Sequence, residues 1–117
     1  MFNDIFFFLK SRVPEISYIG IWDRDGLEVE RVHYDRHNFN TELLGAECAD
    51  IVTRLSRASG GKAPGLLEAR WQENVITATA LKGSFFLLAM TTSPAIAAKT
   101  RFYLQSASHK INSLLSH

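Results

Sequence analysis

The first half of the chain alternates between helical and extended hydrophobic patterns. Residues 4–12 are predicted to form a short helix capped by Asn3 and ended before Pro14, because proline disfavours a helical residue in front of it. Residues 16–22, which are rich in β-branched and aromatic types, predict a strand that is apolar on both faces and therefore lies inside a sheet. An Asp-Gly hairpin turn follows, and residues 27–34 alternate like a strand with one wetter face near a sheet edge.

The second half of the chain contains one helix, three strands and a final helix. Residues 35–40 form a polar loop that supplies an N-cap, and the next segment has one apolar stripe with helical spacing, made of Leu44, Cys48, Ile51 and Leu55. Residues 66–71, 75–81 and 85–91 read as strands separated by short turns, which is typical of an antiparallel meander. Ser93 and Pro94 then start a long C-terminal helix, because proline suits the first helical position.

The predicted order of elements is therefore α-β-β-α-β-β-β-α. Hairpin connections dominate this order, so the fold class is α/β (α+β), with a central five-stranded antiparallel sheet and helices on its faces in a three-layer α/β/α sandwich. The chain has 117 residues, which is the usual size of one domain, and we expect residues 1–117 to form a single domain.

Composition and charge exclude several classes of function. The formal net charge of +1 is too small for the positive field that non-specific nucleic-acid binding needs, so we expect no nucleic-acid partner. The single cysteine, Cys48, rules out an internal disulfide and fits a reducing cytosol, and it falls on the apolar stripe of the middle helix, where a core residue is expected. The apolar run 5–9 is too short to span a membrane or to act as a secretion signal, which predicts a cytoplasmic protein without membrane insertion.

The sequence contains few residues that could bind a metal or phosphate or carry out catalysis. The alternating residues His33, Asp35 and His37 project to one side of an extended chain, but they supply too few ligands for a tight metal site, and solvated strand-end residues are the favoured interpretation. The glycine-rich stretch around Lys62 lacks the spacing of a phosphate-binding loop. Catalytic motifs of the hydrolase and zinc-protease types are absent from the sequence, so we expect no enzymatic activity and no cofactor.

The N-terminal run IFFFL, residues 5–9, is too apolar for one helix face. Neighbouring helical residues point about 100° apart, so either the helix is covered on two sides within the fold or one of the phenylalanines faces outward. Ile5, Phe8 and Leu9 have the i, i+3, i+4 spacing of a core face. This leaves Phe7 as the candidate anchor for another protein, because aromatic residues dominate interface energetics.

Three segments, in the order of elements given above, together resemble the roadblock (dynein light-chain) family. They are the hairpin WDRDGLEVERV, the helix ELLGAECADIVTRL, and the strands VITATALKGSFFLLAMTTSP in front of a long helix. Residues 6–32, FFFLKSRVPEISYIGIWDRDGLEVERV, also look like the scaffold subunits of the late-endosomal Ragulator complex, which belong to the same superfamily. The resemblance implies a dimer formed by third strands and second helices, no active site, and a role in binding or regulating small Ras-like GTPases or in scaffolding. The sequence AIAAKTR after Pro94 departs from the pattern of bacterial GTPase partners.

The residues themselves also favour a homodimer or a heterodimer with another roadblock-like chain. The strand 66–71 is expected at a sheet edge, where Glu68 of one chain can approach Arg70 of the other in a two-fold pair. Gly45 in the middle helix suggests the close approach of another backbone. The predicted dimer interface comprises Gly45, Cys48, Leu66, Glu68, Ala69, Arg70 and Trp71. Two alternatives remain: a small-ligand or metal sensor, and a longin-like or profilin-like trafficking domain.

Overall fold

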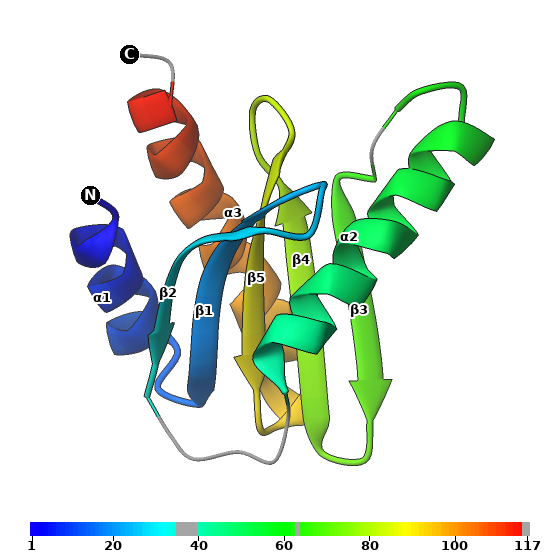
Figure 1. Ribbon diagram of the computed structural model, residues 1–117. Coiled ribbons are helices and arrows are strands. Elements are labelled where there is room, and N and C mark those ends of the chain that lie inside the picture. Colours follow the sequence, from blue (N-terminus) through cyan, green and yellow to red (C-terminus); the bar gives the residue numbers. More distant parts are fainter. Residues whose placement is uncertain (35–39, 63, 116–117) are drawn as a thin grey trace.

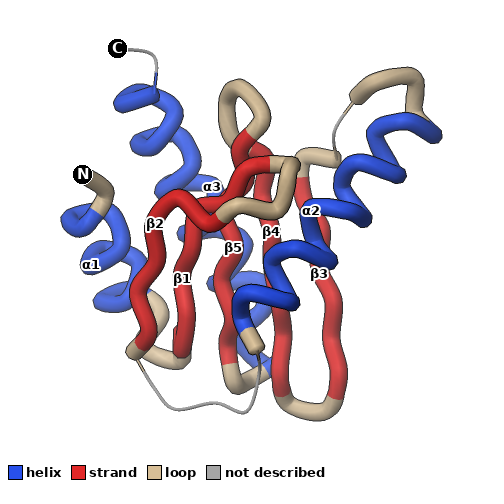
Figure 2. Tube along the Cα trace, viewed as in Figure 1, coloured by secondary structure: helices blue, strands red, loops and turns tan. Residues whose placement is uncertain are grey.

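The computed structural model describes residues 1–34, 40–62 and 64–115. Its centre is a five-stranded sheet in the order β2-β1-β5-β4-β3, and every neighbouring pair of strands is antiparallel. Helices α1 and α3 lie side by side on one face of this sheet, and α2 crosses the other face (Figure 1). This arrangement confirms the predicted three-layer sandwich and its order of elements (Figure 2).

The element boundaries agree closely with the sequence pattern. The strands are β1 (Ile16–Asp23), β2 (Glu28–His33), β3 (Leu66–Trp71), β4 (Asn74–Ala80) and β5 (Phe85–Thr91). The helices are α1 (Asn3–Arg12), α2 (Thr41–Ala58) and α3 (Ala97–Leu115), the last preceded by a short 3-10 turn, Pro94–Ile96. Among the described residues, none of these helices combines the length and the hydropathy that crossing a membrane requires.

Strand β1 supplies side chains to both hydrophobic layers. Ile19 and Ile21 face α1 and α3, whereas Tyr18 and Trp22 face α2. Strict alternation would place Ile16 with Tyr18, but Ile16 packs on the α1 and α3 side. The pairing of β1 with β5 shifts between Ile16 and Tyr18, and a bulge of this kind reverses the facing of the residues before it.

Helix α1 differs from its prediction in its start and in its core face. The helix begins at Asn3, so Phe2 holds the capping position, and no side chain caps the helix there. The buried face consists of Phe2, Ile5, Phe6 and Leu9. Phe6 therefore occupies the core position expected for Phe8, which is only half-buried, and Phe7 is 73% exposed.

Candidate interaction surface

The middle helix α2 packs on the sheet through small side chains. Its N-cap is Asn40, whose Oδ1 accepts a hydrogen bond from the Leu43 backbone N–H at 3.1 Å. Besides Cys48, the buried positions of α2 are Thr41, Gly45, Ala49, Val52 and Ser56. The sequence predicted a core stripe of larger residues, and this prediction is wrong for Ile51 and Leu55, each of which is 42% exposed. Half of the apolar stripe therefore faces solvent.

The rotation of α2 follows from a single close contact. A Cβ atom at Gly45 would overlap the six-membered ring of Trp22 on β1, so only glycine lets the helix approach the sheet at this point. The predicted close approach at Gly45 is thus correct in kind, but its partner is an indole of the same chain and not another backbone. The space beside Gly45 is therefore already occupied by a side chain of the same protein.

Cys48 also lies in the core beneath α2, as the sequence suggested. Its side chain belongs to the cluster that contains Trp22, Ala49 and Phe86. Burial, with a smaller contribution from the Glu47 carboxylate, raises the pKa of the Cys48 thiol to about 11. The thiol is therefore protonated at neutral pH, and it has neither the charge nor the access of a nucleophile.

Strand β3 forms an edge of the sheet, as predicted. It pairs with β4 along its whole length, from Leu66 opposite Thr79 to Trp71 opposite Asn74. The side chains of Leu66, Ala69 and Arg70 are exposed. The side chain of Trp71 lies outside the described part of the structure. The other long side of β3 has no strand partner within the part of the chain that the structure describes.

Glu68 on β3 has a partner within its own chain. Its Oε1 accepts a hydrogen bond from Nη1 of Arg101 on α3 at 2.9 Å, and both side chains are partly exposed. The predicted contact of Glu68 with Arg70 across a two-fold axis would therefore have to share a carboxylate that is already paired. Sequence reasoning missed this pair because the two residues lie 33 positions apart.

A polar network connects the sheet to the start of α2. The indole Nε1 of Trp22 donates to the hydroxyl of Tyr18 at 2.8 Å, and that hydroxyl donates to Oε2 of Glu28 at 2.6 Å. Arg31 lies 3.2 Å from Oε1 of Glu28 and 3.6 Å from Glu42 on α2. Burial, reinforced by the hydrogen bond to Glu28, strongly raises the pKa of the Tyr18 hydroxyl, so it stays protonated. The network fixes the position of Trp22 beneath Gly45.

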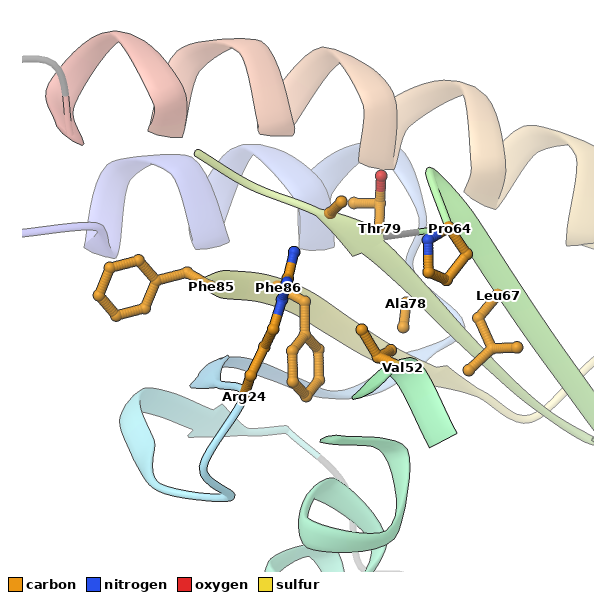
Figure 3. Close-up of a pocket in the computed structure, with 9 residues that line it drawn as sticks. Arg24, Val52, Pro64, Leu67, Ala78, Thr79, Phe85 and Phe86 are labelled. Atoms are coloured by element: carbon orange, nitrogen blue, oxygen red, sulfur yellow. The ribbon is translucent and has the colours of Figure 1, made fainter. Parts of the chain in front are cut away.

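A narrow apolar hollow lies between α2 and β4. Figure 3 shows Val52, Leu67 and Phe86 turned toward this space, while Phe85 points away from it. Arg24 is the only charged residue among those that line it. Ligand sites usually combine an apolar wall with several converging polar groups, which this hollow does not offer, so we interpret it as a packing gap beneath the helix.

The candidate metal ligands are not brought together by the described structure. His33 lies at the end of β2, where its ring packs against Tyr18 with 5.1 Å between centroids. Asp35 and His37 lie outside the described residues. Within the described ranges, no three histidine, cysteine, aspartate or glutamate side chains gather as a metal site.

Comparison with solved structures identifies the fold as that of roadblock/LC7 domains. MglB of Myxococcus xanthus matches with a TM-score of 0.82 and 14% identity, over 97% of this chain and 94% of that one. The roadblock/LC7 domain from Streptomyces avermitilis matches with a TM-score of 0.77 and 16% identity, over 93% and 92%. LokiProfilin2, solved in complex with rabbit actin, matches with a TM-score of 0.61 and 17% identity, over 96% of both chains.

These similarities confirm the predicted roadblock/profilin-like fold. No family model and no curated protein matches the chain at the level of sequence. Similarity in three-dimensional structure therefore establishes the fold. The function has to be inferred from the surfaces that the fold leaves exposed.

Proposed function

We propose that this protein is a non-catalytic, cytoplasmic interaction module that dimerises through α2 and β3 and binds or regulates a small Ras-like GTPase, or serves as a scaffold subunit. The observation that carries the proposal is the uncovered half of the α2 stripe. Ile51 and Leu55 are large aliphatic residues at helical spacing, and each keeps 42% of its side chain in solvent in a single chain. A second chain would remove this apolar surface from water.

The position of β3 supports the same arrangement. Leu55 and Pro64 line a common hollow, and Pro64 leads into β3, so the exposed stripe lies near that edge of the sheet. Antiparallel pairing of two β3 strands about a two-fold axis perpendicular to the sheet puts both α2 helices on the same face. The proposed interface then consists of Ile51 and Leu55 together with the predicted edge residues Leu66, Glu68, Ala69, Arg70 and Trp71. Gly45 and Cys48 support it from the core.

The GTPase partner is supported by the family resemblance of the sequence and by the roadblock/LC7 fold. A dimer that places two α2 helices on one face presents a composite surface wide enough for a globular partner. We therefore expect the paired surface, and not the single chain, to be the binding-competent form. The partner is either a Ras-like GTPase or a larger assembly.

Affinity capture from the native host tests the GTPase partner directly. We expect the tagged protein to enrich a Ras-like GTPase, identified by mass spectrometry and then reconstituted with purified components. The double variant Ile51→Asp/Leu55→Asp should lose this GTPase, because two buried carboxylates would oppose dimer formation. Gln105→Asp, an exposed change on α3 on the other side of the sheet, should retain it. Absence of any GTPase from a dimeric preparation would refute this part of the proposal.

A further inference from the structure

Charge is distributed unevenly between the layers of the molecule. Helices α1 and α3 together carry five lysines and arginines and a single acid, Asp4, which gives this layer a formal charge of +4. The whole chain has a net charge of +1, so the remainder carries −3. The 19 residues of α3 contain no aspartate or glutamate. Arg101 is paired with Glu68 of β3, but the other four cations still make the layer formed by α1 and α3 a basic face on a nearly neutral protein.

The same layer exposes aromatic rings. Phe7 on α1 is 73% exposed and Phe102 on α3 is 66% exposed. Two further rings continue from Phe102 toward α1: Tyr103 meets Phe102 edge to face with centroids 5.1 Å apart, and Phe8 on α1 meets Tyr103 in the same way at 6.0 Å. The aromatic residues thus run across both helices, which lie side by side on one face of the sheet (Figure 1).

Cations lie among these rings. The ammonium of Lys110 is 3.6 Å from the centroid of Phe8, and the guanidinium of Arg12 is 5.7 Å from it. Lys99 is exposed one helical turn before Phe102, on the side of α3 away from the buried Leu104. We call the combination the basic aromatic face: Phe7, Phe8, Arg12, Lys99, Phe102, Tyr103 and Lys110.

We propose that the basic aromatic face binds the surface of an anionic lipid bilayer. Aromatic rings and long cationic side chains are the residues that favour the interface between headgroups and acyl chains, and clustered lysines and arginines are attracted to acidic headgroups. A lipid surface carries one sign of charge over the whole contact, which matches the three cations of the basic aromatic face, Arg12, Lys99 and Lys110, in a layer with a single acid, Asp4. The most exposed rings project from the outer sides of two helices, where they can enter a bilayer surface.

This contact requires no spanning helix. The proposal is independent of dimer formation, but a dimer of the kind proposed above strengthens it. The two-fold axis perpendicular to the sheet places both basic aromatic faces on the side opposite α2, so one dimer would meet the bilayer with two faces. The GTPase surface at α2 and the lipid surface would then lie on opposite sides of the molecule.

Co-sedimentation with lipid vesicles tests this inference on the intact protein. We expect binding to vesicles of phosphatidylserine and phosphatidylcholine, little binding to phosphatidylcholine alone, and weaker binding as the salt concentration rises. Phe7→Ser/Phe102→Ser should reduce the affinity about tenfold or more, because the rings no longer enter the interface. Lys99→Gln should reduce it about fivefold, as expected for one cation near an anionic surface.

Matched changes on α2 serve as controls. Leu43→Ser removes an exposed apolar side chain, 58% accessible, and Arg57→Gln removes an exposed cation, both on the opposite side of the sheet. Neither should alter vesicle binding. Absence of binding to anionic vesicles overturns the proposal. So does binding that the phenylalanine variant leaves unchanged while polyglutamate competes equally well, because that result assigns the face to an acidic protein.

Discussion

Replacing Phe6 by alanine is expected to destabilise the protein by about 3 kcal/mol or more, whereas the same change at Phe7 should cost almost nothing. The two residues are neighbours in sequence and identical in type, but they lie on different sides of α1. Phe6 is 2% exposed and packs with Leu9 and Ile19, while Phe7 is 73% exposed. Truncation of Phe6 loses buried apolar contacts and leaves a cavity, and truncation of Phe7 does neither.

Denaturant unfolding at one fixed protein concentration measures both changes, since self-association would contribute to apparent stability. The two variants serve as controls for each other, because helix propensity changes equally in both. Similar losses for Phe6→Ala and Phe7→Ala would show that α1 is rotated from the position described here.

Gly45→Val is expected to lower the free energy of unfolding by about 2 to 3 kcal/mol. The added side chain would overlap the Trp22 ring, and the ring has little freedom to move because its Nε1 is held by the Tyr18 hydroxyl at 2.8 Å. Glycine costs up to about 1 kcal/mol of helix propensity relative to alanine, so a destabilising substitution at this position is evidence of steric overlap.

Ala46→Val is the matched control for that change. It introduces the same β-branched residue one position further along α2, where the side chain is exposed, and only a small loss of propensity is expected. A stable Gly45→Val protein, with unfolding unchanged from the parent, would contradict the packing of Trp22 against the helix.

Sequence reasoning predicted the sheet more accurately than the faces of the helices. Alternation with a period of two and short turns determine where strands start and stop, and the predicted 66–71 and 85–91 agree with β3 and β5 residue for residue. The edge position of β3 was also predicted. These features depend on local patterns of residues, which a single sequence contains.

The direction in which a helix faces depends on contacts that are distant in sequence. In α2 the apolar stripe was located correctly, but the Trp22 ring against Gly45 decides which flank of it is buried. In α1 several phenylalanines compete for one core position, and Phe6 occupies it. The bulge after Ile16 is likewise set by pairing between β1 and β5. None of these outcomes can be computed from residue spacing alone.

The candidate interaction surfaces also divide into features that local sequence patterns predict and features that depend on distant contacts. The sequence predicted the exposed Phe7 and the edge strand β3, but the exposure of Ile51 and Leu55 becomes visible only once α2 is placed on the sheet. The exposure of Phe102 was not predicted either. Phe102 lies between the buried positions Thr100 and Leu104 on α3, and this spacing turns its side chain outward. Large apolar residues that lie just beside a core stripe are therefore the sequence signal for an exposed interaction surface.

Light scattering on the purified protein at micromolar concentration tests the central claim most directly. We predict a dimer, with twice the mass of one chain, that becomes a folded monomer in Ile51→Asp/Leu55→Asp and remains a dimer in Gln105→Asp. Circular dichroism on the same samples verifies that each variant is folded. A parent protein that is monomeric under these conditions, or a double variant that remains dimeric, would contradict dimer formation through the exposed stripe of α2.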